Sequence, residues 1–425
     1  MKNYKKTIIL GMAFINLSLN SYAKEYDLNS LLDLTTQNNI DGKIARTKVE
    51  EVEAEIENAK SEYYPTITGV IGSEARNSAT DSSINTTNTV GELRVDYNLY
   101  KFGGTTNRVS SLKSLKKEEE KIVNFTETNI KRQLKKEYYE ALSFREVIDI
   151  LKEEINFNKT LKKQVKLKKD QGLVGAADIL EIDMRDATLT NELLKLEEEF
   201  QHSLDNIRRI TYIPHNEEIR LKGNIPHDHF HVNEEKLVSE AMNKNLELSR
   251  TQIKVESLNY ELNANQTQNL PQVNLSGRYG KMRIDEQYSN DEKLEGLVGV
   301  YIEIPLFNGG EKSSQIRKLR SKLAREKLNR DKRQNHLKID VIHRFERMET
   351  IHKQADLAER NVANGKNYFK NVLNEYKRGI KNSLDLVSAR DRLAAFKKDL
   401  IEYRKEYLFA ILDLEKITNT TILKE

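Results

Sequence analysis

The spacing of hydrophobic and polar positions changes several times along this chain, and each change predicts a different kind of element. From residue 27 to 64 the pattern is helical and rich in Glu, Lys and Ala, with no proline before Pro65. Between Val90 and Tyr100 the pattern alternates, which predicts a strand with one apolar and one polar face. Its apolar positions are Leu93, Val95, Tyr97 and Leu99, and its polar positions are Glu92, Arg94, Asp96 and Asn98.

The same alternation returns in the second half of the chain. There Val298, Val300, Ile302, Ile304 and Leu306 alternate with Gly299, Tyr301, Glu303 and Pro305. Weaker alternation precedes each of these segments, so we expect two strand pairs, 65–76 with 90–100 and 271–282 with 297–307. The joining segments are rich in Ser, Thr and Asn (77–88) or strongly charged (283–296), as exposed loops are.

Two long segments without proline, about 105–170 and 312–378, predict long helices. Each reaches a glycine, Gly172 or Gly379, where we expect a turn and a second helix that runs back. Apolar residues recur at spacings of three and four, as in the seam of an antiparallel coiled coil. The first hairpin carries two such stripes. One consists of Leu134, Tyr138, Leu142, Arg145, Ile148, Leu151 and Ile155, in which Arg145 is the polar member, and the other of Leu189, Leu193, Leu196, Phe200, Leu204 and Ile207.

The chain is built of two similar halves. Pro65-Thr66-Ile67-Thr68 recurs as Pro271-Gln272-Val273-Asn274, and Leu99-Tyr100-Lys101 recurs as Leu306-Phe307-Asn308. Asp178-Ile179-Leu180 recurs as Asp385-Leu386-Val387, in the same register as the two glycines. One register held over so long a distance predicts a duplicated structural unit. We expect a first repeat at 24–210, a linker at 211–235 and a second repeat at 236–425.

Strands of about ten residues with one apolar and one polar face are typical of a transmembrane β-barrel. The flanking helices carry no apolar surplus that could cover the apolar face. Four strands cannot close a barrel, and a bilayer does not tolerate unpaired strand edges. The remaining strands must come from other copies of the chain, and about twelve strands from three copies would enclose an aqueous lumen.

Composition narrows the classes further. The chain has no cysteine, which excludes disulfides, Cys-ligated zinc and thiol nucleophiles. With 32% charged residues and a mean hydropathy of -0.70, it cannot form a bundle of apolar membrane helices. No catalytic triad, paired-carboxylate cleft or phosphate-binding loop stands out, so we expect neither an enzyme nor a cofactor.

Residues 1–23 are typical of a cleaved signal peptide. Lys2, Lys5 and Lys6 precede a short apolar run, and Ser21-Tyr22-Ala23 offers small residues at the cleavage positions. We expect cleavage before Lys24 and export of the mature chain. Removal of these lysines lowers the formal net charge from +4 to +1, which gives no reason to expect a nucleic-acid partner.

Together these motifs resemble the TolC family of outer membrane efflux proteins, over about residues 27–420. The resemblance rests on Tyr64-Pro65 and Leu270-Pro271 before each strand pair, on Leu99-Tyr100-Lys101-Phe102-Gly103 and Pro305-Leu306-Phe307-Asn308-Gly309-Gly310 after it, and on the Gly turn with Asp six residues later. It implies a mostly α-helical homotrimer, with a 12-stranded barrel in outer membrane lipid continued by a periplasmic α-helical coiled-coil barrel. It also implies the exit duct of a tripartite efflux pump or type I secretion system, with a periplasmic adaptor and an inner-membrane transporter as partners.

The resemblance implies that the tips of the two helical hairpins dock the adaptor. Here these tips are Gln171, Gly172, Leu173 and Val174 in the first repeat, and Arg378, Gly379 and Ile380 in the second. The family often has an aliphatic residue before each glycine, and Gln171 and Arg378 depart from that. The simpler alternative is that both glycines only end a helix in the left-handed conformation.

The resemblance also implies an acidic constriction just past the tips, held closed by a tyrosine and a basic residue. The matching positions are Asp178, Glu181, Tyr376, Lys381 and Asp385. A second acid is found one turn later in some relatives, but Ser388 stands there in the second repeat. The alternative role for Asp178 and Asp385 is to cap exposed N–H groups at the start of a helix.

Two further alternatives remain open. The run His227-Asp228-His229-Phe230-His231 places three imidazoles close together, but with no fourth ligand in view we favour an exposed linker over a zinc site. The chain could also be a soluble periplasmic coiled-coil scaffold or adaptor that never enters the membrane. The alternating strands favour the channel.

Overall fold

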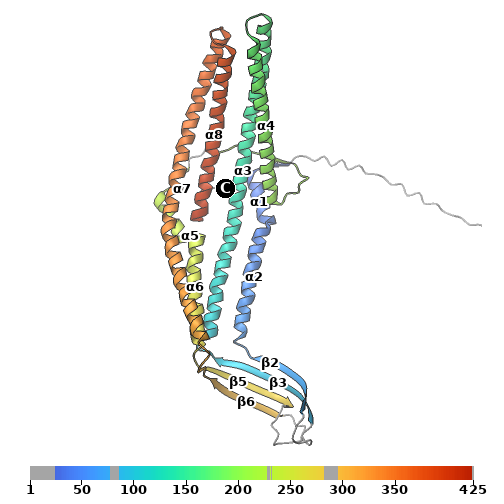
Figure 1. Cartoon of the computed structure of the whole chain (residues 1–425), viewed down its shortest axis with the longest axis vertical. Helices are drawn as coiled ribbons and strands as arrows, with labels where there is room; N and C mark the ends of the chain where they lie inside the picture. The colour runs from blue at the N-terminus through green and yellow to red at the C-terminus, as the bar shows by residue number, and fades with distance from the viewer. Residues whose placement is uncertain (1–23, 77–85, 227–229, 231, 282–294, 424–425) are drawn as a thin grey trace, which may run out of the picture.

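The computed structural model describes residues 24–76, 86–226, 230, 232–281 and 295–423. The expected signal peptide lies outside these residues. The described chain is an elongated body of helices with a curved four-stranded sheet at one end (Figure 1). The two hairpin tips lie at the other end of the body, so the two expected functional regions are at opposite ends of the molecule.

The two halves have the same series of helices. The first contains α1 (Leu28–Asn38), α2 (Ile40–Ser61), α3 (Gly104–Asp170) and α4 (Ala176–Thr211). The second contains α5 (Glu234–Lys244), α6 (Leu246–Thr267), α7 (Glu311–Lys377) and α8 (Ser383–Thr418). Corresponding helices have equal lengths of 11, 22, 67 and 36 residues. The expected duplication is therefore confirmed.

The helices form a single layer that changes partners halfway along the body. Near the sheet, α2 packs against α3, α3 against α6, and α6 against α7. Nearer the tips, α4 packs against α3, α3 against α8, and α8 against α7. Helix α7 therefore lies at one edge of the layer along its whole length, while α2 and then α4 form the opposite edge (Figure 1).

The main hydrophobic core lies at the middle of the body, where the two halves meet. It contains Leu134, Tyr138 and Leu142 of α3 and Leu408, Ile411 and Leu414 of α8, all buried. The short strands β1 (Lys24–Tyr26) and β4 (Ile219–Leu221) pair in parallel beside this core. A separate cluster near the tips packs Leu161 and Val165 of α3 against Val372 and Leu386 of the second hairpin.

The four-stranded sheet has the order β2-β3-β5-β6, and all neighbours are antiparallel. Its strands are β2 (Thr66–Arg76), β3 (Thr86–Tyr100), β5 (Gln272–Lys281) and β6 (Glu295–Glu303). The central β3–β5 pair joins the two repeats, so β2 and β6 form the edges of the sheet in this chain. Four antiparallel strands per chain are as expected.

The bounds of two strands differ from the expected ranges. Strand β6 ends at Glu303, so Ile304 and Leu306 follow the strand instead of extending it. Pro305 explains this end, because proline has no N–H to donate to a neighbouring strand. Strand β3 begins at Thr86, earlier than the alternation predicts.

Candidate functional site

The strand register brings the apolar residues of all four strands onto one face of the sheet. Ile67, Val95, Gly277 and Val298 form one row across the strands, and Tyr97, Leu275 and Val300 form the next. These side chains are far from buried: Ile71 is 91% exposed and Val298 is 76% exposed. A sheet with such a face in water would expose a broad apolar surface, which marks a site of contact with lipid or protein.

One position of the predicted apolar face is corrected by the structure. The register between β3 and β5 shifts between Asn98 and Tyr100, so Tyr100 pairs with Val273 of the apolar face. Leu99 falls at this irregularity. A bulge of this kind inserts one residue and re-aims the side chains that follow it, which strict alternation in the sequence cannot reveal.

The opposite face of the same sheet is polar and hydrogen-bonded. Asp96 lies between Thr66 and Ser276, and the Ser276 hydroxyl donates to the Asp96 carboxylate over 2.9 Å. In the next row the Asn274 amide donates to Glu303 over 3.1 Å. Arg94 forms an ion pair with Glu92 on the same strand. An apolar face and a wet face on one sheet fit a barrel wall between lipid and a water-filled lumen.

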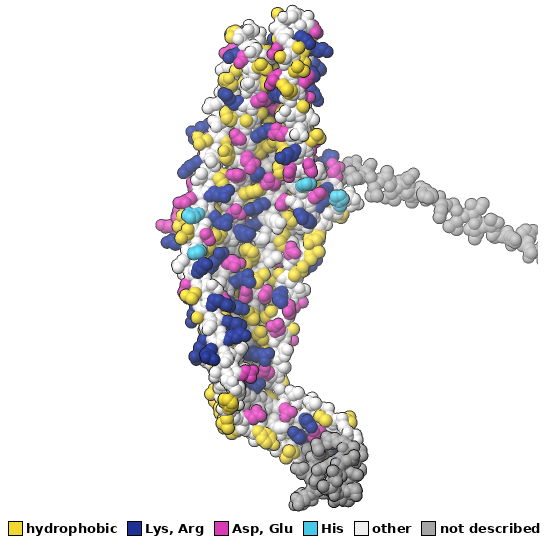
Figure 2. All heavy atoms as spheres, viewed as in Figure 1, with side chains coloured by type: hydrophobic (Ala, Val, Ile, Leu, Met, Phe, Trp, Pro, Cys, Tyr) yellow, Lys and Arg dark blue, Asp and Glu magenta, His cyan; other side chains and the backbone are white. Residues whose placement is uncertain are grey.

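Exposed aromatic and aliphatic side chains gather where the helices join the sheet. Tyr64 is 70% exposed and Phe307 is 90% exposed, and the rings of Tyr100 and Phe102 meet edge to face at 4.7 Å. Figure 2 shows hydrophobic side chains around this junction, below a body covered with charged groups. Such a girdle is typical of the water interface of a membrane protein. In the sequence these residues are recognised only as parts of motifs. Nothing in the sequence shows that they lie at the same level along the long axis of the molecule.

In the described residues, none of the helices has an apolar stretch of sufficient length and low charge to traverse a bilayer.

The hairpin tips lie at the far end of the body from the sheet. Gly172 and Gly379 have φ values of +74° and +79°, in the left-handed region. Each glycine closes its helix: the Leu173 N–H donates to Lys168 over 2.9 Å, and the Ile380 N–H donates to Glu375 over 2.9 Å. Leu173 and Ile380 are nevertheless exposed, at 68% and 69%. The glycines end the helices, as the simpler reading requires, and the turns present apolar side chains to the surroundings.

The other predicted tip residues lie around these turns. Gln171 and Arg378 are exposed, and Val174 is partly buried against the tip cluster. The structure therefore brings the seven residues of the predicted docking surface to two adjacent tips.

Two of the three predicted acidic gate residues, Asp178 and Asp385, take part in capping a helix. The Asp385 N–H donates to the Asn382 side chain over 2.9 Å, and the Asp385 carboxylate accepts from the Asn382 N–H over 3.1 Å. Asp178 accepts from the Gly175 N–H over 3.1 Å at the equivalent place. Asp178 also accepts from the Ser383 hydroxyl over 3.4 Å, which links the two hairpins. Capping uses some of the hydrogen-bond acceptor capacity of each carboxylate, and both residues remain only partly buried.

The remaining gate residues have different surroundings. Lys381 lies 3.9 Å from the Asp385 carboxylate, and Glu181 is exposed on α4. Tyr376 is buried in the tip cluster, and the Lys168 ammonium lies 4.2 Å from the centre of its ring. Its hydroxyl is buried and has no hydrogen-bond partner among the described residues. The structure thus groups Lys381 with Asp385, but places Tyr376 against α3.

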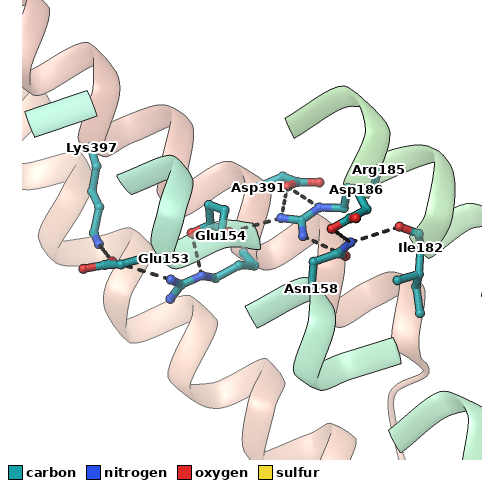
Figure 3. Close-up of polar contacts among 9 residues, drawn as sticks. Glu153, Glu154, Asn158, Ile182, Arg185, Asp186, Asp391 and Lys397 are labelled. Carbon is teal, nitrogen blue, oxygen red and sulfur yellow. Dashed lines mark hydrogen bonds and ion pairs between the residues drawn. The ribbon is translucent and has the colours of Figure 1, made fainter. Parts of the chain in front are cut away.

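Sequence reasoning missed a charged network that crosses between the hairpins (Figure 3). Arg185 of α4 donates to Glu154 of α3 over 3.1 Å and to Asp391 of α8 over 2.9 Å. Arg390 of α8 lies 2.7 Å from the other oxygen of Glu154. Asn158 donates to the Ile182 carbonyl over 3.0 Å and accepts from Arg185 over 3.1 Å.

Glu154 is the buried centre of this network, at 1% exposure. Burial raises the pKa of Glu154, although Arg390 and Arg185 oppose the shift. Three helices from both repeats supply these charges, so their contacts fix the first hairpin against the second. A charge run along one helix gives no sign of this, since charged residues normally face solvent.

No metal site emerges from the described chain. Within it, no group of three or more His, Asp or Glu side chains could hold an ion. His227, His229 and His231 lie outside the described residues, so the expectation about this segment stays a prediction.

Several solved structures share this fold. The outer membrane channel CmeC of Campylobacter jejuni superposes with a TM-score of 0.79 at 16% identity, covering 92% of this chain and 85% of that one. The outer membrane protein VceC of Vibrio cholerae gives 0.80 at 14% identity, covering 93% and 97%. The Neisseria gonorrhoeae MtrE outer membrane channel gives 0.79 at 12%, covering 92% and 89%. None of the curated proteins matches the chain.

The second repeat also matches a family directly: residues 237–420 fit the outer membrane efflux proteins. The second repeat therefore matches the outer membrane efflux proteins, and the chain as a whole has the fold of TolC-like outer membrane channels. The roles of individual tip and gate residues are not decided by these similarities.

Proposed function

We propose that this chain is an outer membrane channel with its helical part in the periplasm, a homotrimer that serves as the passive exit duct of a tripartite efflux pump or type I secretion system. The observation that carries the proposal is the four-stranded sheet with one exposed apolar face, one polar face and two edge strands. Lipid contact suits the apolar face, and water in a lumen suits the polar face. Because unpaired strand edges are not tolerated in a bilayer, β6 of one copy must pair with β2 of another.

The size of the lumen favours three copies. A closed barrel of about eight strands is filled by its own side chains, whereas about twelve strands leave an aqueous channel. The long hairpins α3–α4 and α7–α8 would then enclose a continuous tunnel across the periplasm. Helices of 67 residues extend roughly 100 Å at about 1.5 Å per residue, which is enough for such a tunnel.

The tips are the proposed docking surface for a periplasmic adaptor, which links the duct to an inner-membrane transporter. Leu173 and Ile380 support this role, since exposed apolar side chains at the end of a charged helical body are unusual without a partner. The energy for transport would come from the inner-membrane partner. Cargo would also be selected there, since this passive duct has no energy source of its own.

The proposed entrance gate consists of Asp178, Glu181, Tyr376, Lys381 and Asp385. Three-fold repetition would place several carboxylates around one narrow opening and focus negative potential there. Capping by Asp178 and Asp385 is compatible with this role, because a carboxylate that accepts one N–H still carries its charge.

Membrane fractionation tests the duct directly. The mature chain should be recovered in the outer membrane as trimers that resist SDS until heated, and purified trimers should conduct ions across a planar bilayer. A mature chain that stays monomeric and soluble without detergent would overturn the proposal. Affinity purification from native membranes, with an untagged strain as the control, would then identify the adaptor and transporter.

A further inference from the structure

The two edges of the helical layer near the sheet, α2 and α7, carry faces that pack on no other helix or strand among the residues that the structure describes. Helix α2 packs mainly against α3, and the first half of α7 packs mainly against α6 (Figure 1). Each has an exposed apolar side chain on its free side: Ile44 of α2 is 61% exposed and Leu328 of α7 is 70% exposed. Two free edges on opposite sides of one layer suit a partner that is a second copy of the chain.

The contact that these edges would make already exists inside the chain. Where the first repeat meets the second, α3 packs on α6 with Ser111 and Ser257 buried and their hydroxyls 2.9 Å apart. Further along, the Arg250 guanidinium donates to Glu118 over 2.9 Å. Near the sheet, a Cβ on Gly104 would come within 2.6 Å of the Thr267 hydroxyl, so the two backbones approach closely there.

Duplication of the chain transfers this contact to the free edges. Helix α7 corresponds to α3 and helix α2 corresponds to α6, with equal lengths in each pair. Lys318 then takes the place of Ser111, and Glu51 takes the place of Ser257. Arg325 and Ile44 take the places of Glu118 and Arg250. A Ser–Ser contact inside the chain thus becomes a Lys–Glu pair between copies.

The charges of the two edges agree with this assignment. Residues 50–57 of α2 include five glutamates and no cation. Residues 317–327 of α7 include six lysines and arginines and one glutamate. Both segments lie in the part of their helix nearest the sheet, so the charges fall at similar heights. Opposite charges on two surfaces steer them together and fix their register, while like surfaces repel.

The structure assigns the seam between copies: we propose that α7 of one subunit docks on α2 of the next, with Lys318 facing Glu51. The inference rests on the proposed trimer and adds the residues that join it. In the single chain Glu51 is exposed and forms an ion pair with Lys48 of its own helix at 2.6 Å. Because a surface ion pair contributes little to stability, Glu51 can readily exchange Lys48 for a new partner. The aliphatic stem of Arg325 would cover Ile44.

Cysteine cross-linking tests this register, because the chain has no cysteine of its own. In the full-length channel, Glu51→Cys with Lys318→Cys should form a disulfide between subunits on mild oxidation of outer membranes. Denatured samples without reductant should then contain covalent trimers in place of monomers. The matched control is Glu53→Cys with Lys318→Cys, since Glu53 faces its own chain and bonds Lys116 of α3 over 2.9 Å. A disulfide requires Cα atoms within about 7 Å, so the control should stay uncross-linked.

The possible outcomes distinguish failure of the proposed seam from failure of the proposed duct. Intact trimers with no 51–318 cross-link, or with the control pair cross-linked equally well, would overturn the seam and leave the duct standing. Absence of any trimer in the unaltered protein would overturn both.

Charge reversal tests the same contact between Glu51 and Lys318 by a second method, which does not depend on thiol geometry. Glu51→Lys should reduce several-fold the fraction of trimer that survives mild heating, because it places two cations together at the seam. Addition of Lys318→Glu to this variant should restore the fraction. A double variant no better than Glu51→Lys alone would contradict the assignment.

Discussion

Asp178 and Asp385 occupy equivalent positions in the two repeats, yet their surroundings differ. Asp385 exchanges two hydrogen bonds with Asn382, whereas the first repeat has Gly175 at that place, which offers only its N–H. Asp178 instead reaches Ser383 of the other hairpin. Each carboxylate therefore has a structural task, and the proposed gate role must be tested by a property that capping alone does not affect.

Block by a multivalent cation is such a property. Asp385→Ala should weaken the block of single-channel current by a trivalent cation, because it removes three charges from the entrance of a trimer. It should also cost less than about 1 kcal/mol in helix stability, because Asn382 keeps its bond to the N–H of residue 385 and only the carboxylate half of the capping box is lost. Planar bilayer recording measures the first effect, and Asp331→Ala, on α7 far from the tips, is the control. Unchanged block in Asp385→Ala would contradict the gate role.

The buried network gives a second prediction at this scale. Arg185→Met should lower the unfolding free energy by about 3 kcal/mol, because it leaves the Glu154 charge buried with one partner fewer. Addition of Glu154→Gln should recover most of the loss, since it removes the charge itself. Thermal unfolding of detergent-solubilised protein compares the variants. Glu153→Gln, next along the chain but 59% exposed at its side chain, should change little.

The same network has a pH dependence. Because burial raises the pKa of Glu154 in the folded chain, its contribution to stability is full below the unfolded pKa. That contribution is lost as pH rises through the higher folded pKa. The unaltered channel should therefore lose more stability than Glu154→Gln on going from acid to neutral pH. Equal losses of stability in the unaltered channel and in Glu154→Gln would contradict a raised pKa of Glu154.

At the scale of the elements, the register of the strands determines which side chains lie on each face of the sheet. A shift of one residue in any strand would exchange its apolar and polar faces. Gly280 helps to fix the central pair: its φ is +141°, and a Cβ there would lie 2.2 Å from the Gly91 carbonyl oxygen of β3. Only glycine fits so close an approach, and it holds the strand that joins the two repeats in place.

The two faces of β6 should respond differently to the same substitution. Val300→Lys puts a charge on the apolar face and should cost about 2–4 kcal/mol if that face lies near the middle of a bilayer. Tyr301→Lys puts it on the polar face, beside Asn274, and should be tolerated. The yield of heat-modifiable trimers in the outer membrane compares them. Equal yields would show that lipid does not cover the Val300 face.

At the scale of the whole molecule, the apolar surfaces lie at the two ends of a charged body (Figure 2). The sheet end suits lipid, and the tips suit a protein in the periplasm. The middle is held by the main core and by the charged network between hairpins. This distribution would separate membrane insertion from the proposed adaptor docking, so the two proposed functions should fail independently.

Tip variants test this separation. Leu173→Asp combined with Ile380→Asp should abolish export while trimer yield and bilayer conductance stay unchanged, because the charges oppose docking to an apolar partner surface. Asn191→Asp, on an exposed site further along α4, is the control and should export normally. Loss of trimers in the tip variant would mean that the tips serve folding rather than docking.

The sequence by itself determined the duplication, the long hairpins, the glycine turns and the two-faced strands. Each follows from residue spacing within one segment or from one segment repeated. The tertiary structure alone decided the bulge at Leu99, the burial of Tyr376 and the pairing of Glu154 with Arg185 and Arg390. These depend on contacts between segments that are distant in the sequence, more than two hundred residues apart for Glu154 and Arg390, and a local pattern carries no information about which distant side chain completes a contact.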